Sequence, residues 1–261
     1  MIKKLDQCWR IFATALSFLA FGLGGLLLRL AVFPLLKLAV GNQHAQEVKL
    51  ARLIVHITFK AFINLMQGLG VLRYRINGLE KLDRPGLLIL ANHPSLIDVV
   101  FLIAMIRNAD CVVKASLARN PFTRGPVRAT NYICNDSGAP LVDACIASLR
   151  EGSNLVMFPE GTRTPVSGIM KLQRGAANIA VRGRHDITPV TIHCVPLSLA
   201  KDMPWWKVPP QRIQFTIDIQ DDIAVRPFIE QAEGEMAVAA RQLTHHLHHY
   251  FSTENTHHAG A

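Results

Sequence analysis

Apolar side chains dominate the first forty residues of the chain. An uncharged apolar run extends from Ile11 to Leu28, close to the ~20 residues that a helix needs to cross a bilayer. Arg29 interrupts the run, and the apolar character resumes from Leu30 to Val40, where Pro34 is expected to bend the segment. The pattern predicts a membrane-associated helical segment near the N-terminus.

The orientation of this segment is left open by the sequence. Basic residues lie on both sides of the apolar run, so the positive-inside rule does not choose a direction. A transmembrane helix and a hairpin that dips into one leaflet are both compatible with the pattern. A signal peptide is disfavoured, because no small-residue cleavage site follows and the run exceeds a usual signal-peptide apolar region. The basic residues are Lys3, Lys4 and Arg10 before the run, and Arg29, Lys37, Lys49 and Arg52 after it.

A second helical stretch is predicted from Glu47 to Leu72. Its apolar residues recur at helical spacing, and polar and basic side chains occupy other positions. The pattern favours an amphipathic helix lying in the membrane interface. A helix packed on a catalytic domain is the alternative. The basic positions are Lys49, Arg52, His56 and Lys60.

The period of the pattern changes after residue 71. Leu72, Tyr74 and Ile76 alternate with two arginines, which is the two-residue period of a strand. Short β-rich runs then alternate with helical stretches, as in an α/β domain. Seven strands are expected in one sheet, at Leu72–Asn77, Gly86–Ala91, Cys111–Ala115, Asn131–Cys134, Asn154–Phe158, Thr188–His193 and Arg212–Ile219. Helices are expected at Ser95–Arg107, Pro121–Ala129, Pro140–Arg150, Leu172–Val181 and Ile229–Tyr250.

The expected fold class is therefore α/β, a single mostly seven-stranded sheet flanked by helices, with an N-terminal membrane-associated helical segment. The domain organisation that follows is membrane-associated helices over residues 1–71, an α/β domain over 72–251 and a flexible tail over 252–261.

The amino-acid composition limits the classes of molecule that the protein is expected to bind. Half of the residues are hydrophobic, the mean hydropathy is +0.23, and 28 basic against 19 acidic residues give a net charge of +9 and a pI near 9.6. Such a surface attracts anions. Nucleic acid is disfavoured because the chain has no arginine-rich run, zinc-finger spacing or aromatic RNA-binding signature. Lipid headgroups, phosphorylated substrates and an acidic carrier protein remain.

Cysteine usage indicates a reducing compartment. The five cysteines are scattered, with no C-x-x-C pair, so neither a disulfide framework nor a zinc site is expected. Reduced thiols fit a catalytic domain that faces the cytoplasm.

A polar cluster follows the apolar strand that ends at Ala91. His93 and Asp98 are five residues apart, which is not one face of a continuous helix, so their pairing requires His93 to lie in a turn before the helix. Pro94 favours such a turn, since it suits the first helical position. Asp98 then accepts a hydrogen bond from the imidazole Nδ1–H and leaves Nε2 free as a base. A buried structural histidine bonded to a carboxylate is an equally good interpretation of this cluster alone.

The surroundings of His93 contain no serine nucleophile motif. Ser95 is close in sequence, but no G-x-S-x-G surrounds it, and we assign it to helix capping or substrate hydrogen bonding. A His–Asp pair without a nucleophile suits direct attack, in which the base deprotonates an acceptor hydroxyl that then attacks an activated acyl carbonyl.

A second polar cluster follows the strand that ends near Phe158. Gly161 allows a close approach of the backbone, and Arg163 offers a planar fork of donors that suits a phosphate. Lys171 and Arg174 follow at the start of a predicted helix, whose first amides could also attract an anion.

The two clusters together resemble the glycerolipid acyltransferase family, typified by 1-acylglycerol-3-phosphate acyltransferases. The resemblance rests on N-H-P-S-L-I-D at Asn92–Asp98 and F-P-E-G-T-R at Phe158–Arg163. Two weaker blocks agree with it, namely Lys114, Leu117 and Pro121 as K-x-x-L-x-x-x-P and Thr188-Pro189-Val190 as a final proline block. It covers roughly residues 72–197, and the apolar N-terminal helices also suit the family.

The resemblance implies a role for each matching residue. His93 would be the general base and Asp98 its orienting partner, and the residues of the second block would bind the acceptor. The substrate-binding set that we predict is Glu160, Gly161, Thr162, Arg163, Lys171, Arg174 and Ser95. Neither a cofactor nor a metal is expected; acyl-CoA or acyl-ACP, the acyl carrier protein thioester, serves as co-substrate. Backbone amides are expected to form the oxyanion hole.

The expected partners are membrane lipids, a lysophospholipid acceptor, and acyl-CoA or acyl carrier protein, with no nucleic acid. The expected location is the inner (cytoplasmic) membrane, with the catalytic domain facing the cytoplasm.

One stretch departs from the family pattern. The family's second block commonly ends in an arginine that helps to hold the acceptor phosphate, whereas residues 132–136 here read Y-I-C-N-D. Arg124 or Arg128 could substitute for it in space. A different lysolipid, a non-phosphatidate lipid or a glycolipid therefore stays open as the acceptor.

Three functional classes remain to be distinguished. An O-acyltransferase is the leading hypothesis. A lipid hydrolase would share the membrane contact and the His–Asp pair but should show a nucleophilic serine or cysteine. A noncatalytic lipid-binding protein predicts that His93→Ala leaves function intact.

Overall fold

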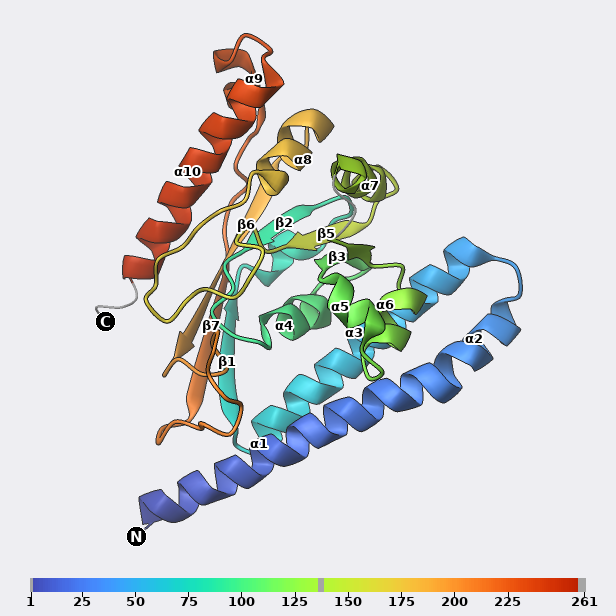
Figure 1. Ribbon diagram of the computed structural model, residues 1–261, viewed down its shortest axis with the longest axis vertical. Coiled ribbons are helices and arrows are strands. Elements are labelled where there is room, and N and C mark those ends of the chain that lie inside the picture. The colour runs from blue at the N-terminus through green and yellow to red at the C-terminus, as the bar shows by residue number, and fades with distance from the viewer. Residues whose placement is uncertain (1, 136–138, 258–261) are drawn as a thin grey trace.

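The computed structural model describes residues 2–135 and 139–257 of the chain (Figure 1). Three helical segments follow one another from the N-terminus: α1 (Ile2–Leu27), the π-helix η1 (Leu28–Val32) and α2 (Phe33–Val40). They form a single apolar helix from Leu5 to Val40 that is long enough, by length and composition, to cross a membrane. The π-helical turn lies directly before Pro34, which has no amide hydrogen to donate to the preceding turn.

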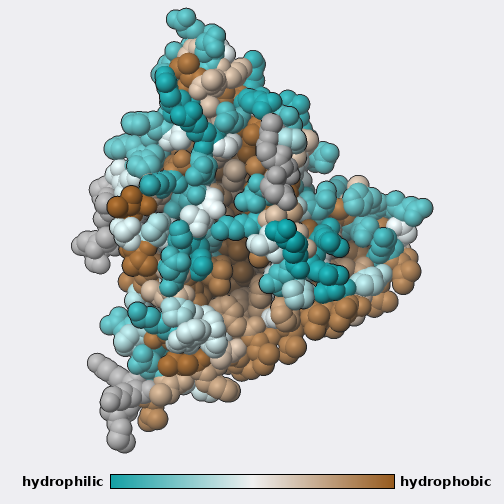
Figure 2. All heavy atoms as spheres, viewed as in Figure 1, coloured by the Kyte–Doolittle hydropathy of each residue, from teal (hydrophilic) through white to brown (hydrophobic). Residues whose placement is uncertain are grey.

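Helix α1 has a packed face and an exposed face. Ala13 and Ser17 are fully buried and Thr14 nearly so, which shows that small side chains let α1 lie close against the rest of the molecule. The opposite face carries large apolar residues at intervals of three and four, which is one stripe of a helix. The exposed stripe consists of Leu5, Trp9, Phe12, Leu16, Leu19, Leu23, Leu27 and Leu30. Figure 2 shows the apolar band that α1 and α2 present along one edge of the molecule.

Helix α3 (His44–Gly68) returns antiparallel to α1 and α2 and packs on the α/β domain (Figure 1). Its buried face includes Val55, Phe62 and Met66. Arg52, which the sequence places among the polar positions of an interfacial helix, is instead buried, and its Nη2 donates to Asp110 Oδ2 at 2.8 Å. The packed-helix alternative is therefore the one observed, although Leu53 and Ile57 stay exposed.

The sheet contains seven strands in the order β1-β7-β6-β2-β5-β3-β4, as expected. All neighbouring pairs are parallel except β6 and β7, which are antiparallel. The carboxyl ends of β2, β5, β3 and β6 consequently lie at one edge of the sheet, where α/β folds bind ligands. The strands are β1 (Leu72–Asn77), β2 (Leu88–Ala91), β3 (Ala109–Val113), β4 (Ile133–Cys134), β5 (Asn154–Met157), β6 (Ile187–Val195) and β7 (Ile213–Ile219).

Helices cover both faces of this sheet. Alternate residues of β2 belong to different hydrophobic clusters, Ile89 and Ala91 to one and Leu88 and Leu90 to the other. The first cluster contains residues of α1, α3 and α4 (Asp98–Met105), and the second contains residues of α7 (Ala139–Arg150), α8 (Gly175–Gly183) and α10 (Met236–His257). The expected boundary between residues 71 and 72 thus runs through one continuous hydrophobic cluster.

Several helix boundaries differ from the expectation. Helix α4 begins at Asp98 instead of Ser95, so Pro94 is not its first residue but part of a non-helical turn. The stretch expected as Pro121–Ala129 is α6 (Arg124–Ala129), preceded by the short α5 (Ala115–Arg119). The other short helices are the 3-10 helix η2 (Leu79–Leu82) and α9 (Arg226–Gln231).

The C-terminal helix also differs. The helix expected over Ile229–Tyr250 is interrupted, because Glu233 and Gly234 both adopt positive φ between α9 and α10. Helix α10 then continues to His257, past the start at residue 252 of the expected flexible tail. Residues 258–261 lie outside the described part of the chain.

Candidate active site

The turn after β2 is held in place by side-chain contacts on both sides. Asn92 bridges to β6, since its Oδ1 accepts a hydrogen bond from the Ile192 amide at 2.6 Å and its Nδ2 donates to the Ile192 carbonyl at 2.9 Å. The carbonyl of His93 accepts a hydrogen bond from the Thr164 amide at 2.7 Å. The turn therefore presents His93 from a rigid sheet edge.

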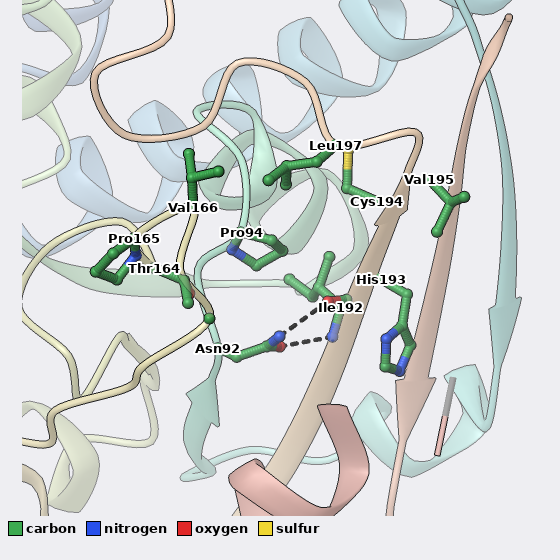
Figure 3. A pocket seen from close by; sticks show the side chains of 11 residues that line it. Asn92, Pro94, Thr164, Pro165, Val166, Ile192, His193, Cys194, Val195 and Leu197 are labelled. Carbon is green, nitrogen blue, oxygen red and sulfur yellow. Dashed lines mark hydrogen bonds between the residues drawn. The ribbon is translucent and has the colours of Figure 1, made fainter. Parts of the chain in front are cut away.

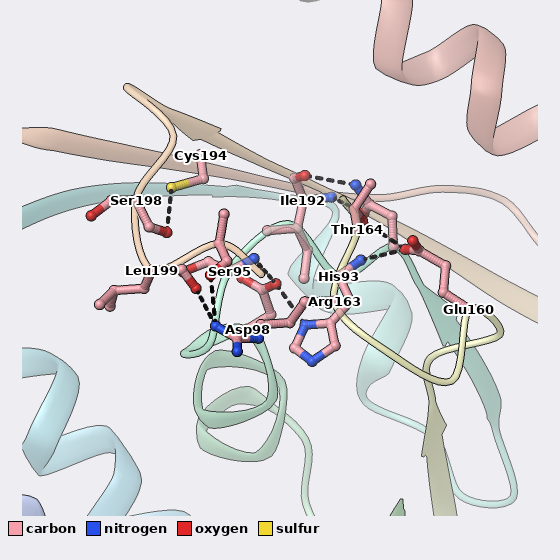
Figure 4. Close-up of polar contacts among 12 residues, drawn as sticks. His93, Ser95, Asp98, Glu160, Arg163, Thr164, Ile192, Cys194, Ser198 and Leu199 are labelled. Atoms are coloured by element: carbon pink, nitrogen blue, oxygen red, sulfur yellow. Dashed lines mark hydrogen bonds and ion pairs between the residues drawn. The ribbon is translucent and has the colours of Figure 1, made fainter. Parts of the chain in front are cut away.

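His93 and Asp98 form the hydrogen-bonded pair that the sequence predicts (Figure 4). Asp98 Oδ2 accepts hydrogen bonds from His93 Nδ1 at 2.9 Å and from the Ser95 amide at 2.6 Å. The Asp98 side chain is fully buried, whereas that of His93 is 16% exposed. The imidazole thus has one nitrogen fixed by a carboxylate and the other, Nε2, directed away from it.

The ring of Phe158 fixes the imidazole from one side. Its centroid lies 4.1 Å from that of His93 with the planes 22° apart, so the two rings are stacked. Phe158 belongs to the second motif, but no periodicity in the sequence points to this contact. The stacking restricts rotation of the imidazole about χ2.

Glu160 connects the two motifs from a buried position. Its Oε1 accepts hydrogen bonds from the His93 amide at 3.0 Å and from Thr164 Oγ1 at 2.8 Å. Only 4% of the residue is exposed. This carboxylate, expected to contact the acceptor, lies where it holds the backbone of the candidate base.

Arg163 lies beside the pair and reaches the segment after β6. Its Nη1 donates to the carbonyls of Leu199 and Ala200, each at 2.8 Å, and the Leu96 amide donates to the same Leu199 carbonyl at 3.0 Å. Within the described residues, Nε and Nη2 of Arg163 make no hydrogen bond to protein. Two sides of the guanidinium fork therefore remain for a ligand.

The remaining predicted site residues lie in the turn of the second motif, on the loop before α8 and in the turn beside Asp98. Gly161 has φ +67°, the left-handed conformation that favours glycine, and is exposed in the turn with the half-buried Thr162. Lys171 and Arg174 have exposed side chains on the loop before α8. The Gln173 amide, between them, donates to the Pro159 carbonyl at 2.7 Å, which brings this loop against the second motif. Ser95 is fully buried, and its amide supports Asp98.

Burial raises the pKa of both carboxyl groups. Desolvation raises the pKa of Asp98, and the hydrogen bond and charge of His93, the Ser95 amide and the Arg163 guanidinium act in the opposite direction. Desolvation also raises the pKa of Glu160, against its hydrogen bonds from Thr164 and the His93 amide. Burial of each carboxylate costs free energy, and its hydrogen-bond donors offset part of that cost.

A cavity of about 280 Å³ opens on the β6 side of the same turn (Figure 3). Asn92 and Pro94 form one wall, and Val166, Ile192, Val195 and Leu197 contribute much of the apolar lining. His93 does not line this cavity. Val166 and Val195 are 62% and 61% exposed, so the mouth of the cavity has an apolar rim.

The neighbouring hydroxyl and thiol groups are not arranged as nucleophiles. Ser95 Oγ is buried without a hydrogen bond to the imidazole. Burial raises the pKa of the Cys194 thiol to about 12, which keeps it protonated at neutral pH. Neither Ser95 nor Cys194 is therefore placed to act as a nucleophile beside the His–Asp pair.

The central part of the chain is similar to known proteins. Residues 73–195 match the acyltransferase family model. The curated 1-acyl-sn-glycerol-3-phosphate acyltransferase of Pseudomonas aeruginosa is 28% identical over 148 residues, covering 53% of this chain and 56% of that protein. The enzyme of the same name from Saccharomyces cerevisiae is 29% identical over 163 residues, covering 59% of this chain and 51% of that protein. The chain thus spans about half the length of these curated relatives.

A solved structure shares the fold over nearly the whole chain. The 1-acyl-sn-glycerophosphate acyltransferase PlsC from Thermotoga maritima superposes with a TM-score of 0.65 at 17% sequence identity, covering 92% of this chain and 97% of that one. At this identity the likeness supports the fold, including the long N-terminal helix and the mixed sheet.

Proposed function

We propose, from the match of residues 73–195 to the acyltransferase family model, that the protein transfers a fatty acyl group from an acyl thioester to a free hydroxyl of lysophosphatidic acid or a related lysolipid. Such an activity belongs to phospholipid biosynthesis. The observation that carries the proposal is the 2.9 Å hydrogen bond between His93 Nδ1 and the buried Asp98, at the carboxyl edge of the sheet.

The proposed mechanism uses His93 as a general base. Asp98 keeps the proton on Nδ1, so that Nε2 accepts the proton of the acceptor hydroxyl as its oxygen attacks the thioester carbonyl. The new C–O bond forms, the C–S bond breaks, and the leaving thiolate takes the proton from the imidazolium. Asp98 stays ionised and stabilises the imidazolium between these two transfers. Because a thioester already has a good leaving group, no covalent enzyme intermediate is needed.

Arg163 is proposed to bind the acceptor phosphate with its free donors. Nη1 is committed to the Leu199 and Ala200 carbonyls, which fixes the plane of the guanidinium, and Nε and Nη2 then present a fork that suits phosphate oxygens. Glu160 is proposed to act on the acceptor only indirectly, through the His93 backbone. Lys171 and Arg174 would add positive charge near the entrance to the proposed acceptor site.

We also propose that the protein is attached to the inner membrane, with its catalytic domain facing the cytoplasm. Ala13 and Ser17 pack against the rest of the molecule while the stripe from Leu5 to Leu30 faces outward. A helix with a folded domain along one side cannot be surrounded by lipid, so this arrangement favours α1 lying in one leaflet over crossing the bilayer. A lysolipid acceptor would then reach the site from the same leaflet.

A panel assay tests the acyltransferase proposal. Purified protein in detergent is mixed with labelled acyl-CoA or acyl-ACP and with lysophosphatidic acid, other lysophospholipids or a glycolipid acceptor. We expect labelled diacyl product with lysophosphatidic acid from at least one of the two donors. If no acceptor is acylated from either donor, the proposal fails; if only a glycolipid or a lysolipid without a terminal phosphate is acylated, the acceptor assignment fails.

The same assay distinguishes a lipid hydrolase. A hydrolase would release labelled fatty acid from a phospholipid and would not depend on an acceptor hydroxyl. The buried Ser95 and the protonated Cys194 argue against that chemistry.

A further inference from the structure

The connection between β6 and β7 joins the candidate site to the N-terminal helix. We refer to residues 199–210 as the strap. At its first end, the carbonyls of Leu199 and Ala200 accept hydrogen bonds from Arg163. At its other end, Pro209 and Pro210 reach α1 (Figure 1). The strap therefore spans from the proposed phosphate-binding arginine to the proposed membrane helix.

The attachment of the strap to α1 depends on a buried arginine. Arg10 is 1% exposed, and its Nη1 and Nη2 donate to the Pro209 carbonyl at 2.9 Å and to the Pro210 carbonyl at 2.6 Å. Gln7 Nε2 donates to the Val208 carbonyl at 3.1 Å. Arg10 also pairs with Asp6 of the same helix, with 3.0 Å between Nη2 and Oδ2. A guanidinium is costly to bury without such partners, and the two strap carbonyls among them indicate that the strap and this turn of α1 form one unit.

The tip of the strap is aromatic, basic and exposed. Trp205 and Trp206 are 43% and 60% exposed, and the next residue, Lys207, is also exposed. The ring of Trp205 packs edge-on against Phe18 of α1, with 6.0 Å between the centroids. Phe18 is half-buried and lies two helical turns from Ile11, which is 37% exposed, so the tip borders the exposed apolar surface of α1.

From these contacts we propose that the strap tip is a second membrane-contacting element, inserted at the interface of an anionic bilayer beside α1. Tryptophan rings favour the depth of the lipid headgroups, and lysine reaches anionic lipid phosphates beside them. The occupant is a bilayer because the tip borders the exposed apolar surface of α1, and because the two lysines of the strap, Lys201 and Lys207, outnumber its one acid, Asp202, and so complement anionic lipid. The inference rests on the proposed membrane attachment, and it adds that the strap sets the height of Arg163 above the bilayer.

The chain offers three tryptophans as probes, Trp9 on α1 and Trp205 and Trp206 on the strap. Variant W9F retains only the strap tryptophans, and variant W205F/W206F retains only Trp9. Each full-length variant is added to phosphatidylcholine–phosphatidylglycerol vesicles with or without bromine on the upper part of the acyl chains. We expect bromine to quench both variants, with a blue shift of the strap emission on binding.

The pattern of quenching distinguishes membrane contact by the strap from membrane contact by α1. Quenching of W205F/W206F without quenching of W9F would overturn the strap proposal and leave attachment through α1 standing. Absence of quenching in both would overturn membrane attachment as well. If the W9F emission is already blue-shifted without vesicles and moves to the red on dilution, a second copy of the chain covers the tip, and the proposal is wrong. Because the readout needs no turnover, none of these results depends on the acyltransferase activity.

A vesicle-partitioning measurement gives the size of the strap's contribution to membrane binding, and it allows comparison with a matched control variant. W205S/W206S should weaken partitioning onto the same vesicles by roughly tenfold. Leu79→Ser removes an apolar side chain that is 44% exposed but lies in η2, beyond the carboxyl end of β1 at the opposite edge of the sheet. It should leave partitioning unchanged. Equal losses for both variants, or none for the tryptophan variant, would contradict the proposal.

Discussion

The imidazole of His93 is fixed by neighbours from three directions. Asp98 binds Nδ1, the Phe158 ring stacks on one face, and Glu160 holds the backbone amide. Of these contacts, the sequence predicts the first, because Pro94 indicates a turn that brings residues 93 and 98 together. The stacking of Phe158 and the hydrogen bond from the His93 amide to Glu160 depend on how close the ends of β2 and β5 lie in the fold. The spacing of residues along the chain does not predict this proximity.

The tautomer of His93 is the first property to test. Asp98→Asn keeps the size of the side chain, but its amide NH₂ can donate to Nδ1 and so place the proton on Nε2. We expect the rate of acyl transfer to fall by roughly 10²–10⁴-fold, with little change in the acceptor KM. Steady-state kinetics in detergent measure this, and a loss of less than tenfold would mean that Asp98 does not set the tautomer.

Glu160 should behave as a clamp on His93. Glu160→Ala removes the acceptor of the His93 amide, and we expect kcat to fall while the acceptor KM stays within a few-fold. Glu160→Gln keeps a carbonyl oxygen that accepts the same two hydrogen bonds, so its kcat should lie much closer to that of the wild type. A large rise in the acceptor KM in both variants would instead indicate that Glu160 binds the acceptor directly.

At the scale of elements, the sequence predicts strands better than helix ends. Leu72–Asn77 matches β1 because alternation in a half-buried strand is a strong signal. The start of α4 at Asp98 and the break at Glu233 and Gly234 depend on local hydrogen bonds and positive φ angles that apolar spacing does not report. The burial of Arg52 is likewise not predicted, since a charge on a helix is usually solvated.

A glycine contact holds α1 against the loop between α5 and α6. A Cβ on Gly25 would clash with the Phe122 carbonyl oxygen, whereas one on Gly24 meets nothing within 4 Å. Gly25→Ala should therefore destabilise the protein by about 1–3 kcal/mol, and Gly24→Ala should be neutral or stabilise it by up to ~1 kcal/mol. Thermal unfolding in detergent measures both. Equal effects of the two substitutions would contradict the close packing of α1 on the loop before α6.

The ion pair between α3 and β3 gives a second test at this scale. Arg52→Met leaves Asp110 buried without its cation, which should cost about 3–5 kcal/mol of stability. Arg182 and Asp143 form an exposed pair at 2.7 Å with side chains 47% and 67% exposed, so Arg182→Met should cost less than ~1 kcal/mol. Chemical denaturation of the two variants should separate them clearly. A mild effect of Arg52→Met would mean that α3 is held mainly by its apolar face.

At the scale of the whole molecule, buried acids should make stability depend on pH. Burial raises the pKa values of Asp98, Asp110 and Glu160 in the folded state. The folded protein therefore binds protons more tightly than the unfolded chain, and this contribution to the free energy of unfolding falls as pH rises through and above the ordinary carboxyl values of 3.8 and 4.5. The three buried acids therefore contribute more to the stability of the folded state at acidic pH than at neutral pH.

The Asp98→Asn variant isolates one of these groups. Because asparagine does not ionise, the stability of the variant relative to the wild type should increase as pH rises from about 4 to 7. Thermal unfolding of the two proteins across this range measures the difference. A constant difference, or one that decreases with pH, would contradict the raised pKa of Asp98.

The architecture places chemistry and apolar surface on the same side of the molecule. The carboxyl edge of the sheet carries the His–Asp pair, and the strap leads from this edge to α1. The sequence predicts both ends of this arrangement, the catalytic motifs and the apolar helix. It does not predict the strap, since the carbonyls that bind Arg163 and Arg10 can come from any residue type.

The most direct test of the central claim is single-turnover acyl transfer by His93→Ala, compared with the wild type at saturating acyl thioester and lysophosphatidic acid. Circular dichroism and thermal unfolding confirm that the variant is folded. If His93 is the general base, the rate constant falls by roughly 10²–10⁴-fold while acceptor binding is retained. A folded variant that transfers acyl groups within tenfold of the wild-type rate would contradict the account.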